Sequence, residues 1–492
     1  VTLTGAMNLT GSAIDLNGTI TAPGGFSSTG TSFDNTGATI TTTNNAIVIN
    51  HSGAVTIGAA LSSGSGIVNI DSTGSTINLN AAINVSTGAV TLDAAGLTTI
   101  SAAGTITATG AASVSFGATL TGTVTTAGNV TTAGGAVRYY RAVQLTGDIS
   151  LDTTSAGSVP AGATIQFDQA VTRDGTARNL SMRAGTGGNV ICAGAIGTGV
   201  APLGAVVVVS ANNFAGNAGA TADAGAITAA SLTQNAGTGT TRLGTVTLTG
   251  AMNLTGSAID LNGAITAPGG FSSTGTTLTI NNTMNAGTTI SATATGAITI
   301  SNANITSTGA QTWSAVAQGV RVTGGGTWQA GGAGISLPNT DMFLDHNGAT
   351  LVLSANLSCR NLYFYRGNLN IAGRTVTTSA NLALWGAAYS PDDIEWTGAD
   401  TRYAYFPAPT LVYYPAGGTY NAGTGLFSTA PNAAFAAGGL AGSTLTVGGN
   451  FYDNGVSMNQ GACTLNIPAN ANSNPIFNTT NAVTANQWGT PY

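Results

Sequence analysis

The chain has 492 residues, only 6% of them charged, and a formal net charge of −6. It contains no lysine and a single glutamate, Glu395, so it lacks the residues that usually cover exposed helix faces. This composition argues against a helical protein, the scattered arginines argue against nucleic-acid binding, and no apolar run approaches the ~20 residues of a membrane-spanning helix.

Short strands are predicted from the first residues onward, because apolar side chains recur as pairs two positions apart, with polar residues between them. Glycine-rich turns separate the pairs, and glycine supplies the positive φ that such corners need. The regular placement of these pairs argues against whole-chain disorder. The pairs are Val1/Leu3, Met7/Leu9, Ile14/Leu16, Ile47/Ile49, Val68/Ile70, Ile77/Leu79, Ile83/Val85 and Val90/Leu92.

Strands this short, with turns every few residues, favour a coil that adds one strand to each of a few parallel sheets per turn. We therefore predict an all-β protein, a right-handed parallel β-helix, over residues 1–337. Aligned positions in successive rungs lie ~4.8 Å apart, where stacked like charges repel, whereas Thr and Asn form hydrogen-bonded ladders.

A block of thirty residues occurs twice, at 1–30 and at 246–275, with one difference: Thr19 is replaced by Ala264. In a solenoid a group of rungs contacts only its neighbours, so it can be duplicated without redesign of a global core. We interpret the repeat as a recent duplication; the alternative is a selected surface.

The composition changes in the last third of the chain, where all five tryptophans occur from Trp313 onward. We predict that residues 338–492 form an aromatic-rich, partly irregular β region that continues or caps the solenoid. This region is also a candidate docking surface, because aromatic residues are enriched in interfaces. Six tyrosines are the candidates for it: Tyr363, Tyr365, Tyr403, Tyr405, Tyr413 and Tyr414.

The stretches "GDISLDTTSAGSVPAGATIQFDQAV" (147–171), "LSMRAGTGGNVICAGAIG" (180–197) and "TQNAGTGTTRLGTVTLTG" (233–250) resemble repeats of filamentous-haemagglutinin-type exoproteins and of autotransporter passengers. Residues 1–335 share the general composition and repeat pattern of these proteins. It implies a secreted bacterial β-helix at the cell surface, used for adhesion or as a structural fibre. The absence of an initiator Met and of a signal peptide leads us to expect a mature or excised product.

Two carboxylate groups are candidates for catalysis: Asp341 and Asp345 with His346, and Asp392 and Asp393 with Glu395. Asp next to Pro or Asn–Gly is also ordinary turn chemistry, and we favour that interpretation. No cofactor is expected, and calcium is the alternative, because Asp and carbonyl-rich loops bind hard cations; the glycine–aspartate repeat of calcium-binding β-rolls is absent. His51 and His346 lie too far apart in sequence to suggest zinc. Cys192, Cys359 and Cys463 favour buried free thiols, with a Cys359–Cys463 disulfide as the alternative.

The leading hypothesis is a non-enzymatic extracellular structural protein that self-assembles into a filament, sheath or layer. The first alternative is an adhesin whose tyrosines stack on glycans of neighbouring cells. The second is a polysaccharide-active enzyme that uses the Asp392 group.

Overall fold

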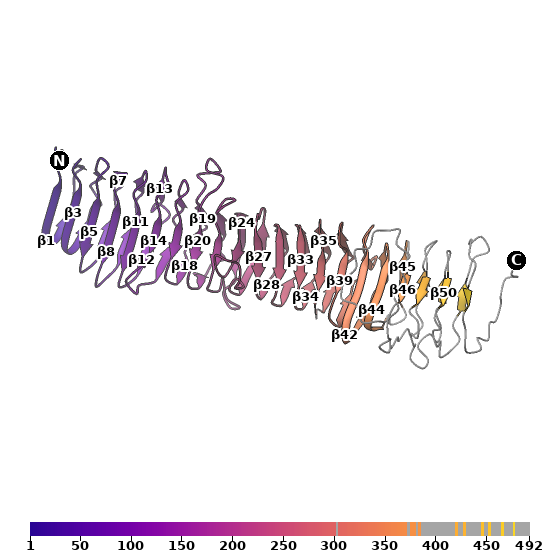
Figure 1. Cartoon of the computed structure of the whole chain (residues 1–492). Coiled ribbons are helices and arrows are strands. Elements are labelled where there is room, and N and C mark those ends of the chain that lie inside the picture. The colour runs from indigo at the N-terminus through magenta and orange to yellow at the C-terminus, as the bar shows by residue number, and fades with distance from the viewer. Residues whose placement is uncertain are drawn as a thin grey trace. The chain divides into compact units, whose positions relative to one another are not determined.

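A computed structural model describes residues 1–301, 304–370, 374–379 and 382–384 and the short strands that follow, with side chains described in 1–301, 304–345, 350–363 and 374–379. The chain divides into two compact units, unit 1 (Val1–Gly263) and unit 2 (Ala264–Tyr492). Each unit is a parallel β-solenoid, and the described residues contain no helix (Figure 1). The predicted all-β class and parallel coil are therefore confirmed.

Unit 1 has three faces, because over much of its length each turn of the coil contributes three strands. Each of these strands pairs in parallel with the third strand after it in the chain, as β11 does with β14, β12 with β15 and β13 with β16. The long strands β1 (Met7–Asp15) and β3 (Phe26–Asp34) each supply the first and the second face. The first face continues with β5 (Ile47–His51), β8 (Val68–Ser72), β11 (Val90–Ala94), β14 (Val114–Phe116), β17 (Val137–Tyr139), β20 (Ile165–Phe167), β23 (Val190–Cys192), β25 (Phe214–Ala215), β27 (Thr240–Leu243) and β30 (Ala258–Leu261).

The second face of unit 1 comprises β6 (Val55–Ile57), β9 (Ile77–Leu79), β12 (Thr98–Ile100), β15 (Val124–Thr126), β18 (Val143–Leu145), β21 (Val171–Arg173), the start of β26 (Ile227–Gln234) and β28 (Val246–Leu248). The third comprises β2 (Ile20–Thr21), β4 (Ile40–Thr41), β7 (Leu61–Gly64), β10 (Ile83–Val85), β13 (Ile106–Ala108), β16 (Val130–Thr131), β19 (Ile149–Asp152), β22 (Leu180–Arg183), β24 (Leu203–Ser210), the end of β26 and β29 (Met252–Thr255).

Unit 2 repeats this pattern with three series of parallel strands. One series is β31 (Ile265–Ala267), β34 (Met284–Ala286), β37 (Ile305–Ser307), β40 (Gly326–Gln329) and the end of β42 (Met342–Leu353). The next is β32 (Phe271–Gly275), β35 (Ile290–Ala294), β38 (Gln311–Ala315), β41 (Ile335–Ser336), β43 (Leu357–Cys359), β45 (Thr375–Thr378), β47 (Thr419–Asn421), β49 (Thr444–Thr446) and β51 (Thr464–Asn466). The third is β33 (Thr277–Ile280), β36 (Ile298–Ile300), β39 (Val320–Val322), the start of β42, β44 (Leu362–Asn370), β46 (Leu382–Leu384), β48 (Phe427–Thr429), β50 (Phe451–Asp453) and β52 (Ile476–Phe477).

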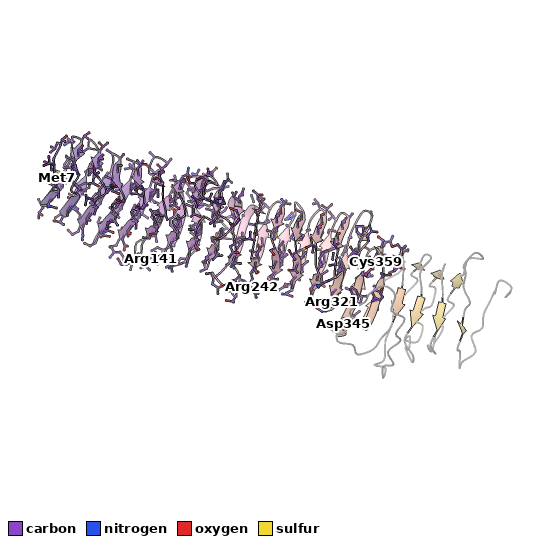
Figure 2. The ribbon with its side chains drawn as sticks, turned by 45° about the horizontal axis from the view of Figure 1, so that its top comes forward. Met7, Arg141, Arg242, Arg321, Asp345 and Cys359 are labelled. Carbon is purple, nitrogen blue, oxygen red and sulfur yellow. The ribbon has the colours of Figure 1, made fainter. Side chains whose placement is uncertain are left out.

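The core of unit 1 contains most of the predicted apolar pairs, and pairs of the same spacing, such as Ile298 and Ile300, lie in the core of unit 2. Ile47 and Ile49 are fully buried with Val48 between them half-buried, since successive side chains of a strand point to opposite sides. Burial is lower at the start of the chain: Met7 and Leu9 are half-buried, because β1 has a described strand neighbour, β3, on one side, and Val1 of the first predicted pair is 66% exposed. Side chains also cover the outside of the rungs, where Arg141 and Arg242 lie (Figure 2).

Corner glycines are needed for two reasons. Gly64 has a φ of 62°, the left-handed conformation that the sequence predicts at turns. Gly88 is required by close approach instead, because an added Cβ would lie 1.9 Å from the carbonyl oxygen of Gly66 in the preceding rung. Rung-to-rung contact of backbone with backbone is thus a second cause of the glycine content, and the sequence alone does not separate it from turn geometry.

Hydroxyl ladders link successive rungs, as the composition predicts. Thr125 Oγ1 donates to Thr99 Oγ1 at 3.3 Å, and Ser115 Oγ donates to Thr91 Oγ1 at 3.3 Å. Thr39 Oγ1 donates to Thr19 Oγ1 at 3.2 Å, a bond that Ala264 cannot make at the equivalent place in the second copy of the repeat.

The repeated block lies on different faces in its two copies. Met7 pairs with Phe26 in the first-face stack of unit 1, which continues to Ile259. Met252 is the equivalent residue of the second copy, yet it pairs with Leu232 in the third-face stack. The same residues therefore form strands on different faces of the coil. A strand on any of the three faces requires only two apolar side chains that point inward and a polar side chain between them that points outward.

Parallel pairing in unit 2 crosses the predicted boundary at 337/338. Val320 and Val322 in β39 pair with Met342 and Leu344 in β42. Strands with parallel partners continue beyond residue 338.

Candidate functional site

Charge is concentrated in a few rungs of unit 1. Residues 1–137 contain four aspartates and no arginine, whereas five of the eleven arginines lie between 138 and 183. Arg138 pairs with Asp168 at 2.8 Å, and Arg178 pairs with Asp174 at 2.7 Å. These rungs carry most of the arginines of unit 1.

One loop in this charged segment has an unusual backbone. It follows β19, and its residues Ser155, Ala156 and Gly157 have consecutive positive φ values of 49°, 57° and 94°. The left-handed conformation costs about 1–2 kcal/mol for each residue that carries a Cβ. Asp152 holds the loop: its Oδ1 accepts hydrogen bonds from Thr154 N and Oγ1, both at 2.7 Å, and its Oδ2 accepts one from Ala156 N at 3.0 Å.

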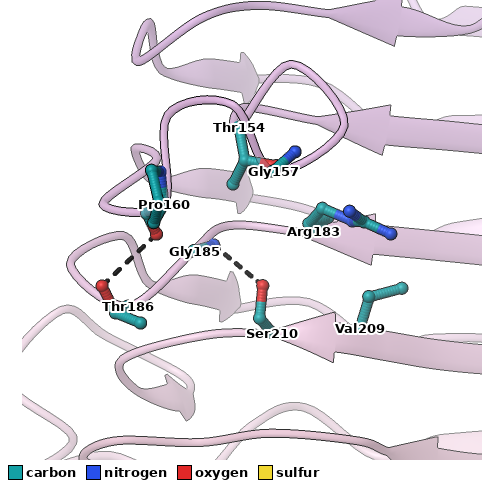
Figure 3. Close-up of a pocket in the computed structure, with 8 residues that line it drawn as sticks. All are labelled: Thr154, Gly157, Pro160, Arg183, Gly185, Thr186, Val209 and Ser210. Carbon is teal, nitrogen blue, oxygen red and sulfur yellow. Dashed lines mark hydrogen bonds between the residues drawn. The ribbon is translucent and has the colours of Figure 1, made fainter.

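A pocket of about 280 Å³ lies beneath this loop (Figure 3). It is lined by Thr154, Gly157, Pro160, Arg183, Gly185, Thr186, Val209 and Ser210. The pocket comes from register: Asp152, Arg183 and Ser210 are aligned in three successive strands of the third face, β19, β22 and β24.

Some polar groups of the pocket already form hydrogen bonds within the protein. Ser210 Oγ accepts a hydrogen bond from Gly185 N at 3.1 Å, and Thr186 Oγ1 donates to the carbonyl oxygen of Pro160 at 3.3 Å. Gly157 N donates to Thr154 Oγ1 at 2.9 Å, so that backbone donor is also occupied.

Arg183 is the one ionisable side chain that lines this pocket. Its side chain is 36% exposed, and its Nε lies 3.9 Å from Asp152 Oδ2, which is long for a charge-assisted hydrogen bond. The eight lining residues thus offer a cation and hydroxyl groups, which can bind an anion, but no group that serves as a general acid or base near neutral pH.

The six predicted tyrosines divide between described and undescribed side chains. Tyr363 is 4% exposed, and its ring stacks on Phe343 with centroids 5.2 Å apart and planes at 15°. A sugar would therefore reach only the small uncovered part of Tyr363. The side chains of Tyr365, Tyr403, Tyr405, Tyr413 and Tyr414 lie outside the described residues, and their role stays a prediction.

The first predicted carboxylate group is in part structural. Asp341 receives two hydrogen bonds from Arg360, from Nε to Oδ1 and from Nη2 to Oδ2, both at 2.7 Å, and a third from Asn361 Nδ2 to Oδ1, also at 2.7 Å. Asp345 is 4% exposed. The side chains of His346, Asp392, Asp393 and Glu395 lie outside the described residues.

The remaining candidate ligands do not gather. Among the described residues no group of three or more His, Cys, Asp or Glu side chains could hold a metal ion. His51 is buried, and its Nε2 lies 2.9 Å from Ser28 Oγ. Cys192 and Cys359 are buried free thiols, and burial raises the pKa of Cys192 to about 12, so neither thiol resembles a reactive cysteine. Cys463 lies outside the described residues.

Sequence reasoning missed the Arg183 pocket. Its residues are spread over three rungs, from Thr154 to Ser210, and are brought together by strand register rather than by a local motif. The usable sequence features were the concentration of arginines in 138–183 and the Asp152–Thr–Thr154 turn pattern.

Within the part of the chain described here, no helix has both the length and the apolar character that crossing a membrane requires. The chain is a β-solenoid repeat protein, and no family model, curated protein or solved structure matches it.

Proposed function

We propose that this chain is a non-enzymatic structural protein of the cell exterior, which builds a filament, sheath or layer by association of its β-solenoid. The observation that carries this proposal is the outer surface of the rungs, where columns of hydroxyl and amide groups replace charge over long stretches. Residues 1–137 hold only four charged side chains, and Thr–Thr and Ser–Thr bonds link their rungs.

Two physical consequences suit such a role. Stability of a solenoid grows by addition of similar rungs, so length is adjustable without loss of the fold. A surface of low charge also presents little electrostatic repulsion to a second copy, so copies can pack side by side.

The resemblance of residues 147–171, 180–197 and 233–250 to filamentous-haemagglutinin-type and autotransporter repeats supports a bacterial surface location. Both groups are secreted β-helical proteins, and the parallel coil of this chain is compatible with them. Location at the surface is part of the same proposal.

The proposal is tested with the purified full chain by sedimentation velocity and electron microscopy over a range of concentrations. Ordered filaments or sheets that grow with concentration are expected. Monomers at every concentration would refute the assembly. Saturable binding of those monomers to a glycan array would then favour an adhesin, and release of sugar fragments from a polysaccharide would favour an enzyme.

A further inference from the structure

We propose that the pocket around Arg183 binds a sugar that carries a single carboxylate, such as a uronate. This inference is independent of the proposed assembly, since the pocket lies wholly within unit 1 and concerns the monomer. It rests on the size of the pocket, the donors and acceptors that the protein leaves free, and the charge beside it.

The size fits one ring. A volume of about 280 Å³ is close to the lower end of the roughly 300–1,000 Å³ that is typical of small-molecule sites. Pro160 and Val209 supply apolar surface on the wall, against which the C–H face of a pyranose ring can lie.

The free polar groups fit a carboxylate together with hydroxyl groups. The guanidinium of Arg183 is a planar donor fork that matches a carboxylate, and its ion pair within the protein is long, at 3.9 Å. Ser210 Oγ accepts from Gly185 N and keeps its own proton to donate, whereas Thr186 Oγ1 donates to Pro160 and keeps lone pairs to accept. A sugar hydroxyl can use both kinds of group.

The neighbouring charge distinguishes a monoanion from a phosphate. Asp152 places a second charge, of negative sign, beside Arg183, and this repels a dianion more than a monoanion. The backbone N–H groups that would cradle a phosphate are already engaged: Ala156 N binds Asp152, Gly157 N binds Thr154 and Gly185 N binds Ser210.

The strained loop gives the pocket a fixed rim. Residues held in the left-handed region persist only where surrounding contacts determine them, and they cluster at binding sites. Ser155 and Ala156 are such residues, and three hydrogen bonds to Asp152 hold the loop over the pocket before any ligand arrives. A rim that is already ordered lowers the entropic cost of binding.

The test is a titration of the full chain with D-glucuronate and D-galacturonate, followed by calorimetry or ligand-observed NMR. D-Glucose, acetate and inorganic phosphate serve as probes for the ring alone, the carboxylate alone and a dianion. We expect one uronate to bind with a Kd on the order of 1 mM, and glucose, acetate and phosphate to bind at least about tenfold more weakly.

Variants locate the site. Arg183→Gln is expected to weaken uronate binding at least about tenfold, which corresponds to loss of one charge-assisted hydrogen bond. Arg178→Gln is the matched control: it removes the same charge from the half-buried Arg178–Asp174 pair, outside the pocket, and should leave the Kd unchanged. Val209→Phe fills the pocket from a half-buried position while both charged groups, Arg183 and Asp152, stay in the sequence, and it should abolish binding even if Arg183→Gln fails to fold.

No saturable uronate binding, equal binding by Arg183→Gln or by Val209→Phe, or tighter binding of phosphate than of either uronate would each overturn the proposal. Circular dichroism of every variant establishes that loss of binding is not loss of fold.

Discussion

Replacement of Gln311 by methionine should destabilise unit 2 strongly, because this buried amide satisfies two tryptophans. Gln311, Trp313 and Trp328 are at most 1% exposed, and the two indole rings pack edge to face with centroids 5.4 Å apart. Trp313 Nε1 donates to Gln311 Oε1 at 3.2 Å, and Trp328 Nε1 donates to the same oxygen. Gln311 Nε2 donates to Ser307 Oγ at 3.1 Å and to the carbonyl oxygen of Gln329 at 2.7 Å.

The magnitude follows from the groups that the substitution leaves unpaired. Methionine has nearly the shape of glutamine but no amide, so two buried indole N–H donors and the carbonyl of Gln329 lose a partner. An unsatisfied buried donor costs about 1–3 kcal/mol, and two donors give about 2–6 kcal/mol. Ser307 Oγ adds little, because it still donates to the carbonyl oxygen of Gly309 at 2.7 Å.

Urea unfolding followed by tryptophan emission and by circular dichroism measures this change. Thr312→Ala is the matched control, since Thr312 lies next to Gln311 on β38 with an exposed side chain, and it should alter the free energy of unfolding by less than about 0.5 kcal/mol. In a Trp328→Phe background one donor is absent, so Gln311→Met should cost about 1–3 kcal/mol less. A cost below about 1 kcal/mol, or no relief by Trp328→Phe, would refute the hydrogen-bond reasoning.

Three further substitutions test unit 1. Asp71 pairs with Asp93 in the neighbouring strand, and burial raises the pKa of Asp71, with a smaller contribution from the charge of Asp93. Asp71→Asn removes this charge and should therefore stabilise the fold by about 0.5 kcal/mol near neutral pH. The difference in stability between the variant and the wild type should vanish in acid, because protonation of a carboxyl whose pKa is raised in the folded state stabilises the wild type as the pH falls. Denaturation of both proteins at several pH values measures this difference. Burial lowers the pKa of His51 below its usual 6.5, so the unfolded chain binds the proton at a higher pH than the folded chain does. The free energy of unfolding of the wild type should therefore fall as the pH drops below 6.5, and a His51→Asn variant should lack this pH dependence. Tyr139 has a buried hydroxyl without a partner within the stack of Phe116 and Phe167, so Tyr139→Phe should raise the melting temperature through a gain of about 1 kcal/mol, and a lower melting temperature would contradict this.

The sequence predicted ladders and turns better than it predicted sites. Spacing by two identified the core pairs, since a strand alternates its faces whatever the tertiary context, and Ile47 and Ile49 are buried as expected. The Arg183 pocket could not be found this way, because its walls come from three successive rungs whose loop lengths differ. Gln311 likewise looks like any polar residue at the start of a strand, and only the packing of Trp328 from a later strand gives it a second donor to satisfy.

By itself the sequence indicated that short alternating strands, closed by glycine, stack into parallel rungs, because strands this short with turns every few residues suit a coil that adds one strand to each face per turn. Only the tertiary structure decided which face each strand occupies. The two copies of the repeated block show this, since Met7 lies in one stack of unit 1 and its equivalent, Met252, in another. The physical reason is that strand pattern is local, whereas face assignment depends on the summed length of every preceding strand and turn.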